Sequence, residues 1–241
     1  MIQEIIANAS NFEIFPENKR KYFEHLAFSY LPEMRLLFRG GKLWGRDSWR
    51  NVVEHCLTEI AAADAFSDLL GIPEEDKEKM MKVAACHDWA KRLEKFPNDF
   101  NKEERAKAEQ FLKAVNPDEE QMKALTFDFF PEWFKKKWMF LQEVQLYVDD
   151  ICSGSSIVTL QERIDGSEKH DPQLNEDPKF TQALGGRYFD KEREFGRKIE
   201  DKFFKILQDK GVNIFLPDKI PELIQQKIDS NIFNFAQKNK Q

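Results

Sequence analysis

The sequence predicts an all-α protein. Its 241 residues include 22 phenylalanines but only ten glycines and ten prolines. Apolar residues recur at the spacing of a helix face along most of the chain, and no Asn-Gly or Asp-Gly pair joins two alternating, strand-like runs. A chain of this length can bury a substantial hydrophobic core.

The helix ends are expected where glycine and proline interrupt the pattern. Gly71 ends one helix and Pro73 begins the next, with Glu74, Glu75 and Asp76 favouring the positive end of its dipole. Residues 165–187 are rich in Asp, Glu, Pro and Gly and are predicted to be a loop or linker. The predicted helices cover residues 17–30, 48–70, 73–96, 101–115, 118–127, 131–152, 158–164, 188–210 and 219–236.

Composition and net charge disfavour some classes of binding partner. The net charge of −6 disfavours a general nucleic-acid surface or an anionic membrane surface. No run of about eighteen apolar residues predicts a membrane span, and the first residues lack the basic start of a signal peptide. Three cysteines without framework spacing fit a reducing compartment. We therefore expect a cytoplasmic protein.

The pair His87-Asp88 is the first candidate for chemistry. It lies in a predicted helix whose apolar stripe includes Met80, Val83 and Ala84. Burying these two polar groups is costly unless they are paired. They therefore either hydrogen-bond to each other or bind a ligand, and a metal ion is a common ligand of a histidine and an aspartate. The alternative is a purely structural pair, in which a buried histidine is hydrogen-bonded to an acidic side chain.

His55 is expected to face His87. It lies 16 residues before Gly71, and His87 lies 14 residues after Pro73. If the short turn makes the two helices antiparallel neighbours, a rise of about 1.5 Å per residue brings the two histidines within about one helical turn of each other in height. A metal held by these residues needs a further oxygen ligand, which Asp149 near the end of the predicted helix 131–152 can supply.

In this order, the residues resemble the HD-domain superfamily of metal-dependent phosphohydrolases. The family pattern is a histidine, then a His-Asp pair, then a distant aspartate, all on helices; here these are His55, His87 with Asp88, and Asp149. The resemblance covers about residues 44–165 and extends to residues 157–164. It implies an HD-like helical bundle with His55, His87, Asp88 and Asp149 as metal ligands. The expected organisation is an N-terminal helical segment (1–43), the HD-type core (44–165), the linker (166–187) and C-terminal helices (188–241) that pack on the core or on a second subunit of a homodimer.

The resemblance also implies roles around the metal. Residues 89–148 contain no histidine, whereas members with two metals have extra histidines here, so one divalent ion (Mn, Fe, Co, Ni, Zn or Mg) is expected. The metal would activate a water for attack on a small phosphate ester such as a nucleotide. Asp88 and Lys91 are the expected catalytic residues, Lys91 lying four residues after His87 on the same helix face and offsetting phosphate charge. Weaker candidates near the substrate are Arg46, Arg50, Glu54, Arg92 and Asp150.

Other residues serve as controls. His170-Asp171 repeats the dipeptide, but Pro172 follows it in the predicted loop, so we expect it at the surface. His25 is interpreted as structural. Cys56 falls on the apolar stripe of residues 48–70, which favours core packing over a zinc site. Asp150 is an alternative to Asp149, because adjacent helix positions point about 100° apart.

Three functions stay open from the sequence. The leading hypothesis is a single-metal phosphohydrolase. The second is a nucleotide-binding or scaffold protein with the same fold but no turnover. The third is a nuclease, which would need a basic groove around residues 135–137, where three lysines are flanked by Trp133 and Trp138. The acidic net charge disfavours the third.

Overall fold

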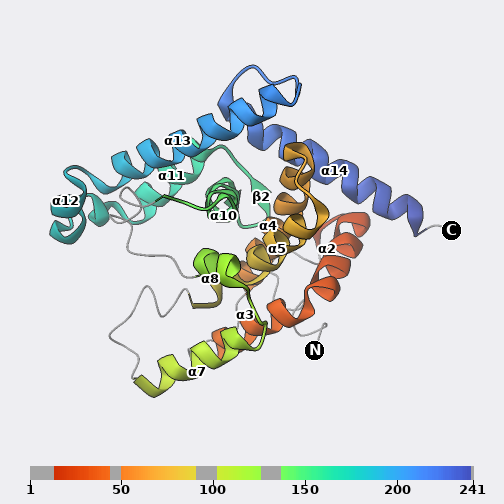
Figure 1. The fold of residues 1–241 in the computed structure, drawn as a ribbon, viewed down its shortest axis with the longest axis horizontal. Coiled ribbons are helices and arrows are strands. Elements are labelled where there is room, and N and C mark those ends of the chain that lie inside the picture. Colours follow the sequence, from red (N-terminus) through yellow and green to blue (C-terminus); the bar gives the residue numbers. More distant parts are fainter. Residues whose placement is uncertain (1–13, 44–49, 91–101, 126–136, 240–241) are drawn as a thin grey trace.

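The computed structural model describes residues 14–43, 50–90, 102–125 and 137–239, and these residues form an all-α fold (Figure 1). A two-stranded antiparallel hairpin, β1 (Cys152–Ser153) with β2 (Ser156–Ile157), is the only sheet among the described residues. The α-helices of these residues are α2 (Glu17–Ser29), α3 (Leu31–Leu43), α4 (Arg50–Leu70), α5 (Glu74–Cys86), α7 (Lys102–Lys113), α8 (Glu119–Leu125), α10 (Phe140–Ile151), α11 (Leu160–His170), α12 (Pro178–Leu184), α13 (Tyr188–Asp209) and α14 (Ile220–Lys238).

The hairpin of α4 and α5 is built as the sequence predicts. Gly71 adopts the left-handed conformation, with φ of +59°, that glycine tolerates at a helix end. The amide of Ile72 donates to the carbonyl of Ser67 at 2.9 Å, which closes the last turn of α4. Pro73 then precedes α5, and the two helices pack along their lengths.

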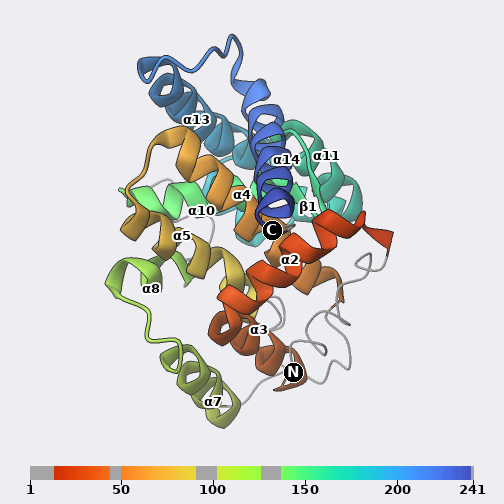
Figure 2. The same ribbon diagram turned by 90° about the vertical axis from the view of Figure 1, so that its right-hand side faces the viewer.

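One hydrophobic core runs from the N-terminal to the C-terminal helices. It is continuous from Tyr22 on α2 to Ile228 on α14, and α14 packs on both α2 and α4 (Figure 2). Helix α10 lies between the α4–α5 hairpin on one side and α11 and α13 on the other (Figure 1). The C-terminal segment 188–241 therefore contributes helices to the same core as the central helices.

The predicted loop at residues 165–187 was wrong over most of its length. Helix α11 continues to His170, a 3₁₀ helix covers Pro172–Asn175, and α12 follows. Local capping outweighs the polar composition. Thr159 and Glu162 form a capping box that starts α11, and the side chain of Asp177 accepts from the amide of Lys179 to start α12.

Three other helix limits differ from expectation. Helix α10 begins at Phe140, where the amide of Met139 donates to the side-chain oxygen of Gln142 at 3.1 Å; residues 131–136 of the predicted helix lie outside the described residues. Helix α5 ends at Cys86, and the turn His87–Ala90 is a 3₁₀ helix, so His87 follows the α-helix instead of lying within it. Helix α3 was not predicted: Pro32 follows the predicted helix 17–30 and lies in the first turn of α3, where proline is tolerated.

None of the helices in the described ranges combines the length and the apolar composition that crossing a membrane requires.

Candidate metal centre

Helix α4 presents two polar side chains on one face of its buried surface. His55 and Glu59 are four residues apart, a spacing that places side chains one above the other on a helix. Glu59 is fully buried and His55 is 6% exposed. Nε2 of His55 lies 2.6 Å from Oε1 of Glu59. A charged carboxyl group held away from water in this way needs a cationic partner or a proton.

His87 reaches the same place from the other arm of the hairpin. Its Nδ1 lies 3.2 Å from the carbonyl oxygen of Ala84 and 3.1 Å from Oε2 of Glu59. A hydrogen on Nδ1 is thus accounted for, which leaves Nε2 as the nitrogen with a free lone pair. Nε2 is buried and makes no hydrogen bond. The rings of His55 and His87 lie 5.5 Å apart, so the two histidines face each other as predicted.

Asp149 completes the arrangement from α10. Its Oδ1 lies 3.0 Å from Nε2 of His55 and 3.9 Å from Nε2 of His87. The side chain is 30% exposed, so this aspartate connects the buried group to solvent. One turn earlier on α10, the side-chain amide of Gln145 donates to Oε2 of Glu59 at 3.0 Å. The contacts from Asp149 to His55 and from Gln145 to Glu59 therefore fix the position of α10 along the axis of α4.

The donor cluster, defined as His55, Glu59, His87 and Asp149, has the chemistry of a metal site. Each residue offers one ligand atom, and the four atoms lie within 4.8 Å of one another. A single ion with four tetrahedral ligands at about 2.0–2.2 Å separates its donors by about 3.4 Å, so the donors need to move closer together by about 1 Å. Two imidazoles and two carboxylates suit Zn, Mn, Fe, Co or Ni. The buried, unbonded Nε2 of His87 also fits a group that coordinates an ion.

Electrostatics in the donor cluster favour a bound positive charge. Burial lowers the pKa of His55, but Glu59 and Asp149 outweigh burial and raise this pKa to about 10. Burial likewise opposes a charged His87, yet Glu59, Asp88 and Asp149 raise its pKa. Burial raises the pKa of Glu59, against the lowering effect of the two histidines. A proton on His55 thus partly offsets the carboxylates, and a divalent cation can replace this proton.

The predicted ligand Asp88 lies beside the donor cluster and outside the convergent group of four. Its Oδ1 is 3.4 Å from Nε2 of His87, and the residue is 7% exposed. The role of Asp88 as a ligand remains a prediction.

The weaker candidates are dispersed. Glu54 is 1% exposed, and its charge acts on Lys19 of α2. Asp150 carries a pKa well above its usual range, because burial and the charges of Glu192 and Asp149 outweigh Arg163. It adds no donor to the cluster, so the geometry agrees with Asp149 over Asp150. Arg46, Lys91 and Arg92 lie outside the described residues, as does the side chain of Arg50.

The two control histidines lie apart from the donor cluster, whereas Cys56 borders it. His170 is exposed at the end of α11. His25 is exposed too, and its ring stacks on Phe235 at 5.0 Å. Cys56 is buried in the core, with Sγ 3.9 Å from Nδ1 of His87. Of the three lysines at 135–137, only Lys137 is described, and it is exposed.

Glu59 is the residue that sequence reasoning missed. Its signal was the four-residue spacing from His55, in a stretch of α4 that is otherwise almost wholly apolar. Gln145 shows the same signal, four residues before Asp149.

Fold and site together define an all-α protein with a buried cluster of two histidines and two carboxylates able to hold a metal ion. No family model, curated protein or solved structure matches the chain.

Proposed function

We propose that the protein is a metal-dependent hydrolase of small phosphate esters, with one divalent ion held by His55, Glu59, His87 and Asp149. The observation that carries the proposal is the convergence of these donors from α4, the 3₁₀ turn after α5, and α10. The ordered His, His-Asp and Asp pattern of the HD superfamily links such a centre to phosphate esters. We expect a nucleotide or another small phosphorylated molecule as the substrate.

In this proposal, the exposure of each ligand residue determines its role. A bound divalent ion lowers the pKa of a coordinated water, so that hydroxide forms near neutral pH. Asp149, at 30% exposure, lies where substrate and water reach the cluster. Glu59 and His87 are held from behind by Gln145 and by the carbonyl of Ala84. Such supporting contacts fix the orientation of ligating side chains. In this proposal, Asp88 orients the water and Lys91 binds a phosphate oxygen.

A second candidate is a structural metal site in a protein without turnover, such as a nucleotide-binding or scaffold protein. The observation that favours it is burial: apart from Asp149, the cluster side chains are at most 7% exposed. Structural sites are closed, whereas catalytic sites keep a position open for water or substrate. The two candidate functions therefore differ in whether substrate and water can reach the ion past Asp149.

The test combines metal analysis with a substrate screen. Purified protein is analysed for bound metal, reloaded separately with Mn, Fe, Co, Ni, Zn or Mg, and assayed for phosphate release from nucleotides, phosphomonoesters and phosphodiesters. We expect a bound ion and turnover of at least one substrate, both lost in His87→Ala and retained in His170→Ala. Asp88→Ala should retain the ion if this side chain orients water, and lose it if Asp88 is a ligand.

The outcomes separate the candidates. Absence of a bound ion after every reloading would overturn both. A tightly bound ion that raises the unfolding temperature, with no turnover across the panel, would replace the hydrolase with the structural site. Turnover that survives His87→Ala would show that the chemistry lies elsewhere.

A further inference from the structure

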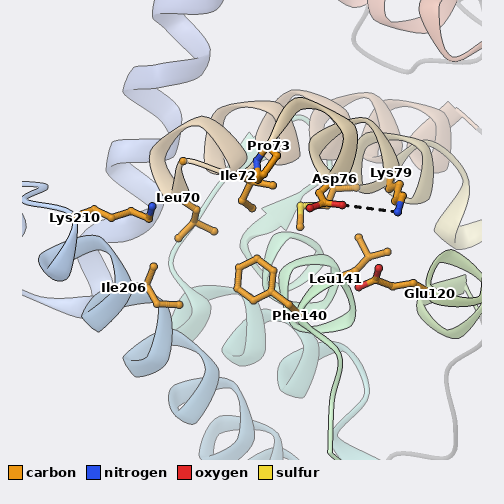
Figure 3. Close-up of a pocket in the computed structure, with 12 residues that line it drawn as sticks. Leu70, Ile72, Pro73, Asp76, Lys79, Glu120, Phe140, Leu141, Ile206 and Lys210 are labelled. Atoms are coloured by element: carbon orange, nitrogen blue, oxygen red, sulfur yellow. Dashed lines mark ion pairs between the residues drawn. The ribbon is translucent and has the colours of Figure 1, made fainter.

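A cavity of about 360 Å³ lies beside the turn between α4 and α5 (Figure 3). Its walls come from the end of α4, the start of α5, α8, the start of α10 and the end of α13. Most of the lining is apolar and includes Leu70, Ile72, Met80, Phe140, Leu141 and Ile206. The volume lies at the lower end of the range of small-molecule sites in proteins.

Phe140 shows that the apolar wall is incompletely covered. It is 36% exposed, although its ring packs edge to face on Phe203 at 6.0 Å. Figure 3 shows the ring between Ile206 and Leu141. An apolar ligand that covers this ring gains about 25 cal/mol for each Å² of apolar surface removed from water.

Charge at the rim restricts the ligand. Lys210 lines one side of the cavity, and among the described residues no ion pair is formed by its ammonium. Its Nζ lies 3.0 Å from where a Cβ on Gly71 would stand, so a larger residue at this turn would displace the ammonium. On the opposite side, Lys79 is paired with Asp118 at 3.4 Å and with Asp76 at 3.8 Å, and Glu120 adds a carboxylate (Figure 3). The Lys210 side thus attracts an anion, and the Glu120 side repels one.

The cavity is distinct from the donor cluster. On α4, Leu70 at the cavity follows His55 by 15 residues, which is about 22 Å along the helix axis. On α10, Phe140 precedes Asp149 by nine residues, or about 14 Å. A molecule in the cavity therefore does not touch the donors, although it contacts the helices that carry them.

We propose that this cavity binds a small amphipathic monocarboxylate, with its carboxylate at Lys210 and its apolar body against Phe140, Leu141 and Ile206. A medium-length alkyl chain matches the space, since a cavity of this volume holds about twelve heavy atoms at about 30 Å³ each. The assignment does not depend on metal binding or on hydrolysis.

The test uses the full chain, both metal-free and metal-loaded, with decanoate as the probe and decanol and decylamine as uncharged and cationic comparators. We expect one decanoate per chain by calorimetric titration below the micelle concentration, with tighter binding than either comparator. Contacts between decanoate and the Met80 methyl group, seen as intermolecular nuclear Overhauser effects, would place it in this cavity.

Variants separate the apolar and the charged contributions. Ile206→Trp fills the cavity and should weaken decanoate at least tenfold. Lys210→Gln should weaken decanoate about fivefold and leave decanol unchanged, whereas Lys205→Gln, at an exposed position of α13 outside the lining, should bind as wild type does. Lys210→Gln alters only an exposed side chain, so it remains informative if Ile206→Trp fails to fold. Absent or non-saturable binding, or equal binding by Lys210→Gln and wild type, would overturn the proposal.

Discussion

Helix α4 carries a cluster of polar side chains in each half, one buried and one partly exposed, and the two clusters are built differently. Near its start is the donor cluster around His55 and Glu59. Nearer its end, Asp64 and Asp68 meet Lys77 of α5: Nζ of Lys77 lies 2.5 Å from Asp64 and 2.7 Å from Asp68, and Lys227 of α14 lies 2.9 Å from Asp68. We call these four residues the lysine network.

The lysine network is balanced within itself. Two aspartates meet two lysines, and Asp64 also accepts hydrogen bonds from the hydroxyl of Tyr22 at 3.2 Å and the amide of Asn231 at 2.8 Å. Such a network needs no added ion, and it ties α2, α5 and α14 to α4. Its groups satisfy one another through charge-assisted hydrogen bonds.

The donor cluster is held differently in the part of the chain that the structure describes. There its carboxylates, Glu59 and Asp149, contact the imidazoles of His55 and His87, and an imidazole is cationic only while it holds an extra proton. Nε2 of His87 makes no hydrogen bond. The comparison teaches that aspartates paired with lysines are balanced without a further ion, whereas two histidines and two carboxylates brought together can hold a metal ion.

The largest expected effect compares two substitutions on the same helix. Glu59→Gln removes a charged donor and should lower divalent-metal affinity about 100-fold, at the upper end of the loss typical for groups that support a metal site. Asp64→Asn changes an acid to its amide in the lysine network and should leave affinity within about twofold. Calorimetric titration with Mn or Zn measures both, and equal affinities in the two variants would remove the distinction between the groups.

The reverse experiment perturbs the lysine network. Lys77→Met leaves two aspartates without their shared cation and should lower the free energy of unfolding by about 1–3 kcal/mol, because a partly buried charge loses its partner. Metal affinity should not change. Urea denaturation of metal-free protein gives the stability, and Lys205→Met provides an exposed control on α13. A loss of metal with no loss of stability would contradict the assignment.

The third effect is a pH dependence specific to the metal-free protein. Because the folded chain raises the pKa of His55 from 6.5 to about 10, it holds a proton that the unfolded chain releases. The resulting stability is complete below about pH 6.5 and is lost as pH rises towards 10, by at most about 1.4 kcal/mol per pH unit. A saturating divalent ion that replaces the proton should abolish this decline.

Urea titrations between pH 6.5 and 9.5, with chelator or with metal, measure this slope. His55→Gln should lose the decline in chelator, and His170→Ala should keep it. A flat profile for metal-free wild type would show that the donor cluster does not depend on a proton.

The sequence predicts those features whose signals are local. The all-α class follows from helical spacing and from the scarcity of glycine and proline, and the α4–α5 turn follows from Gly71 and Pro73. The facing of His55 and His87 follows from counting residues on either side of that turn. Composition misleads at residues 165–187: it indicates a loop, but capping by Thr159 and Asp177 starts helices.

Glu59 was harder to predict, because its place depends on tertiary packing. An i,i+4 pair of histidine and glutamate also suits a solvated helix face, and only the packing of α10 against α4 shows that this face is buried. Asp149 and Asp150 pose the same problem. Which of two adjacent aspartates turns inward is set by the rotation of α10, and the sequence alone does not fix that rotation.

The sequence separation within the donor cluster constrains the order of events during folding. His55 and Glu59 are local, but His55 meets Asp149 across 94 residues and Glu59 meets Gln145 across 86. Contacts of such long range carry a loop-closure cost and are associated with slow folding. Before α10 docks, the α4–α5 hairpin can bring together only His55, Glu59 and His87, and Asp149 joins them when α10 packs on α4. In the proposed metal site, the full set of ligands therefore forms late in folding.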